Sequence, residues 1–328
     1  MSAALRGRAA ASMEAFACGD AMGMPTEFMT LPDIRARFGL VDRLLHPEES
    51  QNHADLPQGA VTDDTEQNLY LLAAYRADGA VTVENTAAAL LRWVRETDAV
   101  AKKYIGPSSK SALEAVEAGA DPHTTGLGGT TCGGVMRVPS VVWFDAAAGE
   151  DALEERVVAC LMPTHFTSQA LEAAGAYAFA LRAALLGAPQ DAVLAAAARG
   201  AARCMARAPY IACAPSAMAR VEGIARMLRR ERMDDAALLD FLYGFCGTGL
   251  PSADVCAAAF ALYLCAGGSA WRAIRLGASV GGDTDTIAAL SGALTAAHSG
   301  ALDVPEPVRA RVRAHNGLDY AALAGEES

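Results

Sequence analysis

Apolar positions recur along this chain with helical spacing, and alanine and leucine make up most of the apolar runs. The stretches 192–202 and 257–266 are rich in alanine, which has the highest helix propensity and little preference for strands. Alternating β-branched residues, which are typical of strands, are scarce. The nearest example is 135–142, and Pro139 interrupts it. The pattern therefore predicts an all-α protein.

Periodicity and capping signals place the expected helices. They span 3–17, 66–77, 83–94, 109–118, 153–161, 168–186, 191–206, 217–228, 234–243, 253–265, 269–278, 286–298 and 307–315. Glycine-rich loops lie between some of them, at 126–134 and at 281–282. Glycine in such loops permits a positive φ or a close approach of the backbone to a ligand. The length of 328 residues allows two domains, although no linker or repeat divides the sequence.

Charge and cysteine content exclude several classes of protein. A net charge of −11 argues against nucleic-acid binding, which needs clustered Lys and Arg. The basic runs 226–232 and 309–315 fit the solvated faces of single helices. The eight cysteines form no C-x-x-C pair, which favours a reducing compartment and a cytoplasmic location.

The most apolar stretch, 255–266, is too short to span a membrane, and Glu14 interrupts an N-terminal segment that otherwise resembles a signal peptide.

Two short acidic clusters carry the clearest chemical signal. They read Thr-Asp-Asp-Thr-Glu at 62–66 and Gly-Gly-Asp-Thr-Asp-Thr at 281–286. Carboxylates crowded this closely repel one another unless a cation or backbone donors neutralise them, and oxygen ligands of this type suit Mg²⁺, Mn²⁺ or Ca²⁺. Helix capping is the alternative, because Asp63 and Glu66 have the spacing of a capping box. The repetition of one pattern favours a cation site.

Several motifs together resemble the ADP-ribosylglycohydrolase family. They are Gly-Asp-Ala-Met-Gly at 19–23 with Pro25 and Glu27, the two acidic clusters, Gly-Gly-Val-Met-Arg at 133–137, and Thr164-His165. The resemblance runs from about residue 9 to residue 298. It implies one compact multi-helix domain, 1–328, with a central dinuclear metal site, because the motifs must meet at one cleft.

The resemblance also implies roles for individual residues. The expected metal ligands are Thr62, Asp63, Asp64, Asp283, Asp285 and Thr286. The expected cofactor is two Mg²⁺ ions, with Mn²⁺ as the alternative. Glu27 is expected beside the attacking water as general acid/base or transient metal ligand, with Asp64 and Asp283 completing the catalytic set. A surface position at a helix end is the alternative for Glu27, and Asp20 is expected to anchor its turn by hydrogen bonds.

Substrate contacts are expected from the glycine loops. The candidate substrate-binding residues are Gly106, Ser108, Cys132, Gly133, Gly134, Met136 and His165. Backbone amides of 131–134 would cradle a diphosphate. Many family members carry Asn-Gly where this chain has Cys132-Gly133, so we expect backbone contacts there in place of a side-chain amide contact. His165 would lie near ribose or phosphate or be a structural histidine, and Arg137 is expected to be functional or to pair with a carboxylate.

The resemblance implies a metal-dependent ADP-ribosyl hydrolase. Its expected substrate is an ADP-ribosylated protein or small conjugate, cleaved at the distal ribose, with no nucleic-acid or membrane partner. One alternative is a hydrolase of another ribosyl or nucleoside-type conjugate. A second alternative is a non-catalytic ADP-ribose-binding or structural relative. Retention of the ligand set and of Glu27 favours an enzyme.

Overall fold

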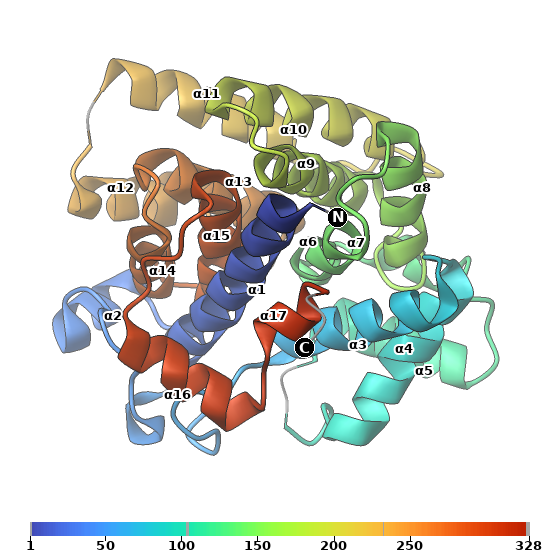
Figure 1. Cartoon of the computed structure of the whole chain (residues 1–328), viewed down its shortest axis with the longest axis horizontal. Coiled ribbons are helices and arrows are strands. Elements are labelled where there is room, and N and C mark those ends of the chain that lie inside the picture. Colours follow the sequence, from blue (N-terminus) through green and yellow to red (C-terminus); the bar gives the residue numbers. More distant parts are fainter. Residues whose placement is uncertain (1, 103–104, 232, 326–328) are drawn as a thin grey trace. The chain divides into compact units, whose positions relative to one another are not determined.

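The computed structural model describes residues 2–102, 105–231 and 233–325, which form helices and loops with no strand among them (Figure 1). The helices are α1 (Ala3–Gly23), α2 (Leu31–Phe38), α3 (Asp63–Asp78), α4 (Val83–Thr97), α5 (Pro107–Glu117), α6 (Gly133–Arg137), α7 (Pro139–Phe144), α8 (Glu150–Leu161), α9 (Ser168–Leu185), α10 (Gln190–Met205), α11 (Ala217–Arg230), α12 (Asp235–Phe241), α13 (Ser252–Cys265), α14 (Ala270–Ser279), α15 (Thr284–Ser299), α16 (Glu306–Asn316) and α17 (Tyr320–Leu323). The all-α prediction is confirmed.

Every helix expected from the sequence is present, and the differences lie at helix ends and in short helices. The first helix continues to Gly23, so the Gly-Asp-Ala-Met-Gly motif is helical. The stretch 135–142, the nearest approach to a strand pattern, instead belongs to α6 and α7. Pro139 is the first residue of α7, where its missing N–H has no helical partner to lose. The short helices α2, α6, α7 and α17 were not expected.

The chain divides into two compact units. The first contains Met1–Thr62, Ala219–Leu250 and Asp254–Ser328, and the second contains Asp63–Met218 and Pro251–Ala253. The division falls inside the first acidic cluster, between Thr62 and Asp63. The expectation of a single domain over 1–328 stays a prediction.

Glycines allow very close helix packing in the core of the first unit. A Cβ added to Gly19 would lie 2.5 Å from the backbone of Ala288, and one added to Gly23 would lie 2.4 Å from the carbonyl oxygen of Thr284. A Cβ added to Gly277 would likewise lie 2.5 Å from Cα of Ala288. Helices α1, α14 and α15 therefore approach one another at a distance that side chains at these positions would prevent. This packing explains the glycines of the 19–23 motif.

The second unit is built in a similar way around α9 and α10. Gly175 and Gly200 face each other, since a Cβ on either would lie 2.4 or 2.2 Å from the other's carbonyl oxygen. Asn68 ties α3 to the short helices, because its Nδ2 donates to the carbonyl of Met136 at 2.8 Å while its Oδ1 accepts from the N–H of Ser140 at 2.8 Å. The N-terminal half of α3 is thereby fixed against α6 and α7.

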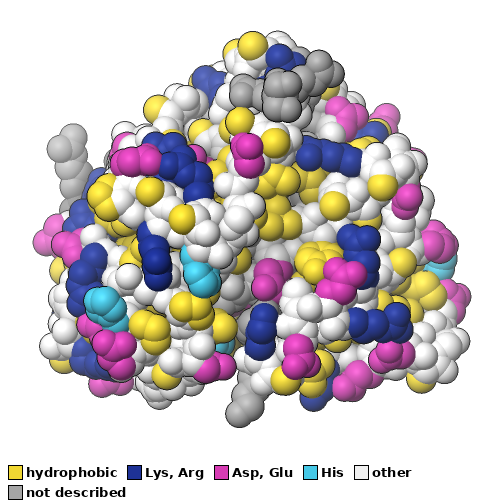
Figure 2. Space-filling view, turned by 60° about the horizontal axis from the view of Figure 1, so that its bottom comes forward, with side chains coloured by type: hydrophobic (Ala, Val, Ile, Leu, Met, Phe, Trp, Pro, Cys, Tyr) yellow, Lys and Arg dark blue, Asp and Glu magenta, His cyan; other side chains and the backbone are white. Residues whose placement is uncertain are grey.

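Charged side chains of both signs are interspersed on the face drawn in Figure 2. Arginines of the two basic runs, 226–232 and 309–315, also pair with acidic side chains: Arg226 lies 3.7 Å from Glu222, and Arg309 lies 2.9 Å from Glu14. None of the described helices is both long and apolar enough to cross a membrane. The cysteines are all free, and Cys213 is exposed.

Candidate metal centre and active site

The second acidic cluster begins α15 after a turn that only glycine fits easily. Gly281 and Gly282 have φ angles of 81° and 82°, in the left-handed region that residues with a Cβ rarely adopt. A Cβ on Gly282 would also lie 2.2 Å from the carbonyl oxygen of Thr248. That carbonyl accepts the N–H of Asp283 at 2.7 Å. The turn therefore fixes the position of Asp283, as expected for these glycines.

Three carboxylates of the first unit converge at this turn. Ligand oxygens of Glu27, Asp283 and Asp285 all lie within 4.8 Å of one another. Asp283 and Asp285 are buried, at 1% and 3% exposure. Asp283 stands at the N-cap position of α15 without a side-chain capping hydrogen bond, so capping does not account for its carboxylate.

This donor set fits a divalent cation. Buried carboxylates at such short separation repel one another, and a bound cation removes the repulsion. All three donors are carboxylate oxygens, which suit Mg²⁺, Mn²⁺ or Ca²⁺ better than zinc. Thr286 is buried in the same turn, where its N–H donates to Asp285 Oδ1 at 2.8 Å. Glu27, Asp283, Asp285 and Thr286 thus lie in one region, and their roles as ligands stay a prediction.

Backbone hydrogen bonds hold Glu27 beside the aspartates. It follows a 3₁₀ turn, η1 (Met24–Thr26). The N–H of Phe28 donates to the carbonyl of Gly282 at 2.7 Å, and the N–H of Gly282 donates to the carbonyl of Met29 at 3.0 Å. Thr284 Oγ1 donates to the carbonyl of Gly23 at 2.8 Å, which ties α15 to the end of α1. Glu27 is therefore part of the carboxylate cluster, and the surface interpretation is wrong.

His53 is a residue of this region that sequence reasoning missed. Its Nε2 makes a very short contact with Glu27 Oε2. The neighbouring Asn52 donates from Nδ2 to the carbonyl of Glu27 at 2.7 Å. His53 lies in an irregular loop and matches no motif, so nothing in its local sequence signals the contact.

In the first acidic cluster, Thr62 holds Asp20, whereas Asp63 and Asp64 begin α3. Thr62 donates its N–H to both carboxylate oxygens of Asp20 at 3.1 Å and its hydroxyl to Oδ1 at 2.7 Å. Asp20 is fully buried, and its anchoring role is as expected. Asp63 and Asp64 begin α3 in the second unit and are buried, at 8% and 1% exposure. Gln67 Nε2 donates to Asp63 Oδ2 at 3.2 Å.

The dinuclear centre formed by both clusters stays a prediction. What the structure describes at the second cluster is one group of three carboxylates in the first unit. The assignment of Thr62, Asp63 and Asp64 as further ligands rests on the family resemblance.

Close packing accounts for the glycines of the 126–134 loop. A Cβ on Gly129 would lie 1.9 Å from the carbonyl oxygen of Thr164, and one on Gly133 would lie 2.7 Å from Cε1 of His165. Cys132, Gly133, Gly134 and Met136 are all buried. Their substrate-binding role stays a prediction, and it would involve backbone groups rather than the Cys132 side chain.

His165 uses both ring nitrogens inside the second unit. Nδ1 lies 2.7 Å from Thr164 Oγ1, and Nε2 lies 2.9 Å from Thr131 Oγ1. Burial and the nearby charge of Arg137 hold the pKa of His165 well below its usual value, so the ring is neutral. Arg137 Nη2 donates to Thr164 Oγ1 and to the carbonyl of Cys160, and no carboxylate is among its described partners. These contacts favour the structural interpretation of His165, whereas the expected pairing of Arg137 with a carboxylate is not found among the described residues.

The first turn of α5 (Pro107–Glu117) places Ser109 against the glycine loop, and the substrate-binding role expected of Gly106 and Ser108 stays a prediction. Gly106 is the N-cap of α5, and Ser108 is half-buried. Ser109 is buried, and its Oγ lies 3.2 Å from the position that a Cβ on Gly133 would occupy. Ser109 therefore joins Gly133 and His165 in one cluster. The sequence offered no way to choose between adjacent serines.

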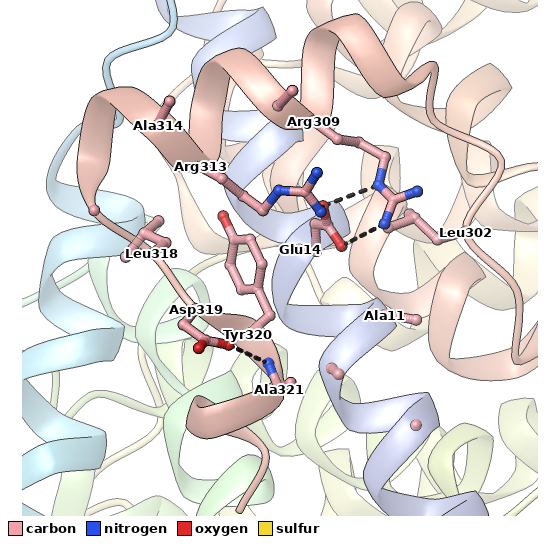
Figure 3. A pocket seen from close by; sticks show the side chains of 14 residues that line it. Ala11, Glu14, Leu302, Arg309, Arg313, Ala314, Leu318, Asp319, Tyr320 and Ala321 are labelled. Carbon is pink, nitrogen blue, oxygen red and sulfur yellow. Dashed lines mark hydrogen bonds and ion pairs between the residues drawn. The ribbon is translucent and has the colours of Figure 1, made fainter. Parts of the chain in front are cut away.

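A cavity of about 840 Å³ lies elsewhere in the first unit, between α1, α16 and α17 (Figure 3). Its charged groups neutralise one another, because Glu14 accepts from Nε and Nη2 of Arg309 at 2.9 Å and from Nη1 of Arg313 at 3.1 Å. None of the expected site residues lines it. The carboxylate cluster, rather than this cavity, is the candidate active site.

Comparison with known proteins identifies relatives that cover most of this chain. The Escherichia coli K12 protein YegU is 30% identical over 306 residues, which cover 93% of this chain and 91% of that protein. An uncharacterised protein of Archaeoglobus fulgidus is 29% identical over 288 residues, covering 86% and 84%. A solved structure described as an ADP-ribosylglycohydrolase-related protein complex has the same fold, with a TM-score of 0.68, 24% identity and coverage of 98% and 96%.

The family assignment follows from these findings. The model of the ADP-ribosylglycohydrolase family matches residues 1–327, nearly the whole chain. Its match includes the motifs that place Glu27, Asp283 and Asp285 within 4.8 Å of one another. This chain belongs to the ADP-ribosylglycohydrolase family, a family of glycosylase-like hydrolases that act on ADP-ribosylated substrates.

Proposed function

We propose that this protein is a metal-dependent ADP-ribosyl hydrolase. It cleaves the glycosidic bond between the distal ribose of ADP-ribose and a protein side chain or small conjugate. The observation that carries the proposal is the group of Glu27, Asp283 and Asp285, whose ligand oxygens lie within 4.8 Å of one another. Free cysteines, seven of them at least partly buried, support a cytoplasmic location for this activity.

The residues present would hold Mg²⁺ or Mn²⁺ at this cluster. When bound, such an ion supplies positive charge that orients the ribose hydroxyls and a water molecule. Asp283 and Asp285 suit the ligand role, because α15 fixes both and burial excludes competing water. Thr62, Asp63, Asp64 and Thr286 complete the proposed ligand set for two ions, on the strength of the family pattern.

Glu27 is the proposed acid/base. Its carboxylate accepts a proton from the attacking water as the water oxygen bonds to the anomeric carbon. The bond from that carbon to the leaving group breaks, the leaving group takes up a proton from solvent, and the protonated Glu27 returns its proton to solvent. The transition state has oxocarbenium character, as in glycoside hydrolysis generally. Glu27 suits this role because its side chain, at 14% exposure, is the most accessible of the three carboxylates, whereas both aspartates are buried.

An activity screen tests the proposal. Purified protein is incubated with arginine-, serine- and nucleobase-linked ADP-ribose, with Mg²⁺, with Mn²⁺, or with EDTA, and released ADP-ribose is measured by chromatography. We expect hydrolysis of at least one linkage that requires the metal. Asp285→Asn is expected to lower the rate by about 100-fold, the upper end of the range for losing an outer-shell partner, because a proposed ligand charge itself is lost at the cluster.

A surface variant controls for general effects of removing an acid. Asp240 is 59% exposed in its ion pair with Arg35, and Asp240→Asn should retain the wild-type rate. Hydrolysis that is equally fast in EDTA would contradict the metal dependence. Failure of the wild-type protein on every ADP-ribosyl linkage, with tight binding of free ADP-ribose, would favour a non-catalytic binder.

A further inference from the structure

We propose that His53 is a positioning residue for Glu27. In this assignment the imidazole Nε2–H donates to Glu27 Oε2 and holds the carboxylate in the orientation that the carboxylate cluster needs. The inference rests on the proposed function for its catalytic meaning, but the contact itself does not depend on that function.

Both partners are shielded from solvent. The side chain of His53 is 5% exposed and that of Glu27 is 14% exposed. A hydrogen bond to a carboxylate at such a site is stronger than one in water, because little solvent competes for either group. An ionised carboxylate only accepts hydrogen bonds, so the ring nitrogen facing it must carry the proton.

The loop that carries His53 is anchored at several points. The N–H of His53 donates to Ser50 Oγ at 2.9 Å, and its carbonyl accepts the N–H of Leu56 at 3.1 Å. Earlier in the loop, Arg43 forms a bidentate ion pair with Glu49, at 2.9 and 2.8 Å. The imidazole is therefore held on a braced loop rather than on a loose one.

The backbone around Glu27 is held separately from its side chain. Asn52 donates to the carbonyl of Glu27 at 2.7 Å. Phe28 has a φ of 60°, an uncommon conformation for a residue with a Cβ, and its N–H donates to Gly282 at 2.7 Å. The remaining freedom of Glu27 is in its side-chain torsions, and the His53 contact limits that freedom.

Charge repulsion makes this contact useful. Carboxylate oxygens of Glu27, Asp283 and Asp285 lie within 4.8 Å of one another. Because like charges at that separation repel, the Glu27 side chain, which is the most exposed of the three, would tend to rotate away from the two aspartates. His53 gives the Glu27 carboxylate a hydrogen-bond donor at Oε2, which opposes that rotation. Partners of this kind commonly change metal affinity or activity 10- to 100-fold when they are removed.

The test compares His53→Ala with His53→Gln, whose amide can donate to the same carboxylate. One readout is kcat and KM on the linkage that the wild-type protein hydrolyses. The second is the affinity of each protein for Mn²⁺, measured by isothermal titration calorimetry without substrate. His123→Ala is the matched control, because His123 is 47% exposed and lies in the second unit.

We expect His53→Ala to lower kcat about 10- to 100-fold with KM changed less than about threefold, and to weaken Mn²⁺ binding. His53→Gln should recover most of both losses, and His123→Ala should match wild type. A merely structural role would lower the melting temperature of His53→Ala and His53→Gln alike without this recovery.

Two results separate this inference from the proposed function. An unchanged kcat and an unchanged Mn²⁺ affinity in folded His53→Ala would overturn the positioning role, even if the wild-type protein is an active hydrolase. A wild-type protein that hydrolyses no ADP-ribosyl linkage, but whose Mn²⁺ affinity falls in His53→Ala and returns in His53→Gln, would reject the proposed reaction and support the contact.

Discussion

Thr62 donates both its backbone N–H and its hydroxyl to the carboxylate of Asp20, over 3.1 and 2.7 Å. Asp20 belongs to α1 and is fully buried. The carboxylate therefore connects the first glycine motif to the start of the first acidic cluster. Asp20 is therefore a structural acceptor that anchors its segment by hydrogen bonds.

Replacing Asp20 tests that role. Asp20→Asn replaces one carboxylate oxygen, which accepts from Thr62, with an amide NH₂ group, which can only donate. A buried donor of Thr62 then loses its acceptor. We expect a loss of about 1–3 kcal/mol in the free energy of unfolding, measured by urea denaturation. Asp55→Asn is the control, because Asp55 is exposed. Equal urea midpoints for the two variants would contradict the assignment.

A methyl group at Gly23 should disturb the site through the backbone. In Gly23→Ala the new Cβ would lie 2.4 Å from the carbonyl oxygen of Thr284 and 2.5 Å from Cα of Asp285. Neither backbone atom can rotate away, so α15 must shift, at a cost of about 1–3 kcal/mol. Activity should fall as well, because Asp285 moves with its helix.

Gly7→Ala provides the matched control in the same helix. A Cβ at Gly7 meets nothing within 4 Å, and alanine favours a helix by about 1 kcal/mol over glycine. The melting temperature of Gly7→Ala should therefore be equal to or above that of wild type. If Gly23→Ala behaves like Gly7→Ala, the close packing of α1 on α15 does not constrain the site.

Divalent cations should stabilise the folded protein. Binding to the native state alone adds about 2.7 kcal/mol to the free energy of unfolding at a ligand concentration 100 times Kd. We expect Mg²⁺ to raise the melting temperature of the wild-type protein in differential scanning fluorimetry, and EDTA to reverse the increase. Asp285→Asn should lose most of the Mg²⁺ effect, since it removes one of three clustered carboxylates.

His165 should make the fold sensitive to mild acid. Its folded-state pKa is held well below its usual value by burial and by Arg137, whereas in the unfolded chain the ring takes up a proton below about pH 6.5. Protonation thus favours the unfolded state, and the stability present above that pH is lost as the pH falls. The loss reaches about 1.4 kcal/mol for each further pH unit.

The measurement compares urea unfolding at pH 7.5 and pH 5.5. His165→Gln should be less stable than wild type at pH 7.5, because it gives up buried contacts, but it should lose less stability between the two pH values. His315→Gln is the control, since His315 is exposed. The same pH dependence in wild type and His165→Gln would contradict the assignment.

Local sequence patterns were sufficient for most helices and for part of the site. Alanine-rich runs predicted α10 and α13, because their composition favours a helix whatever they pack against. The patterns gave no helix at α6 and α7, where β-branched residues lie on both sides of Pro139. Tertiary burial of these residues overrides their strand propensity.

The sequence by itself determined the chemistry available: oxygen ligands at 62–66 and 281–286, glycines beside them, and Glu27 after a glycine motif. Tertiary structure decided which of these groups meet. It gathered Glu27 with Asp283 and Asp285, turned Asp20 toward Thr62, and placed His53 against Glu27. Residue type limits what a side chain can do, but contacts between distant segments depend on how the helices pack, and no local pattern records that packing.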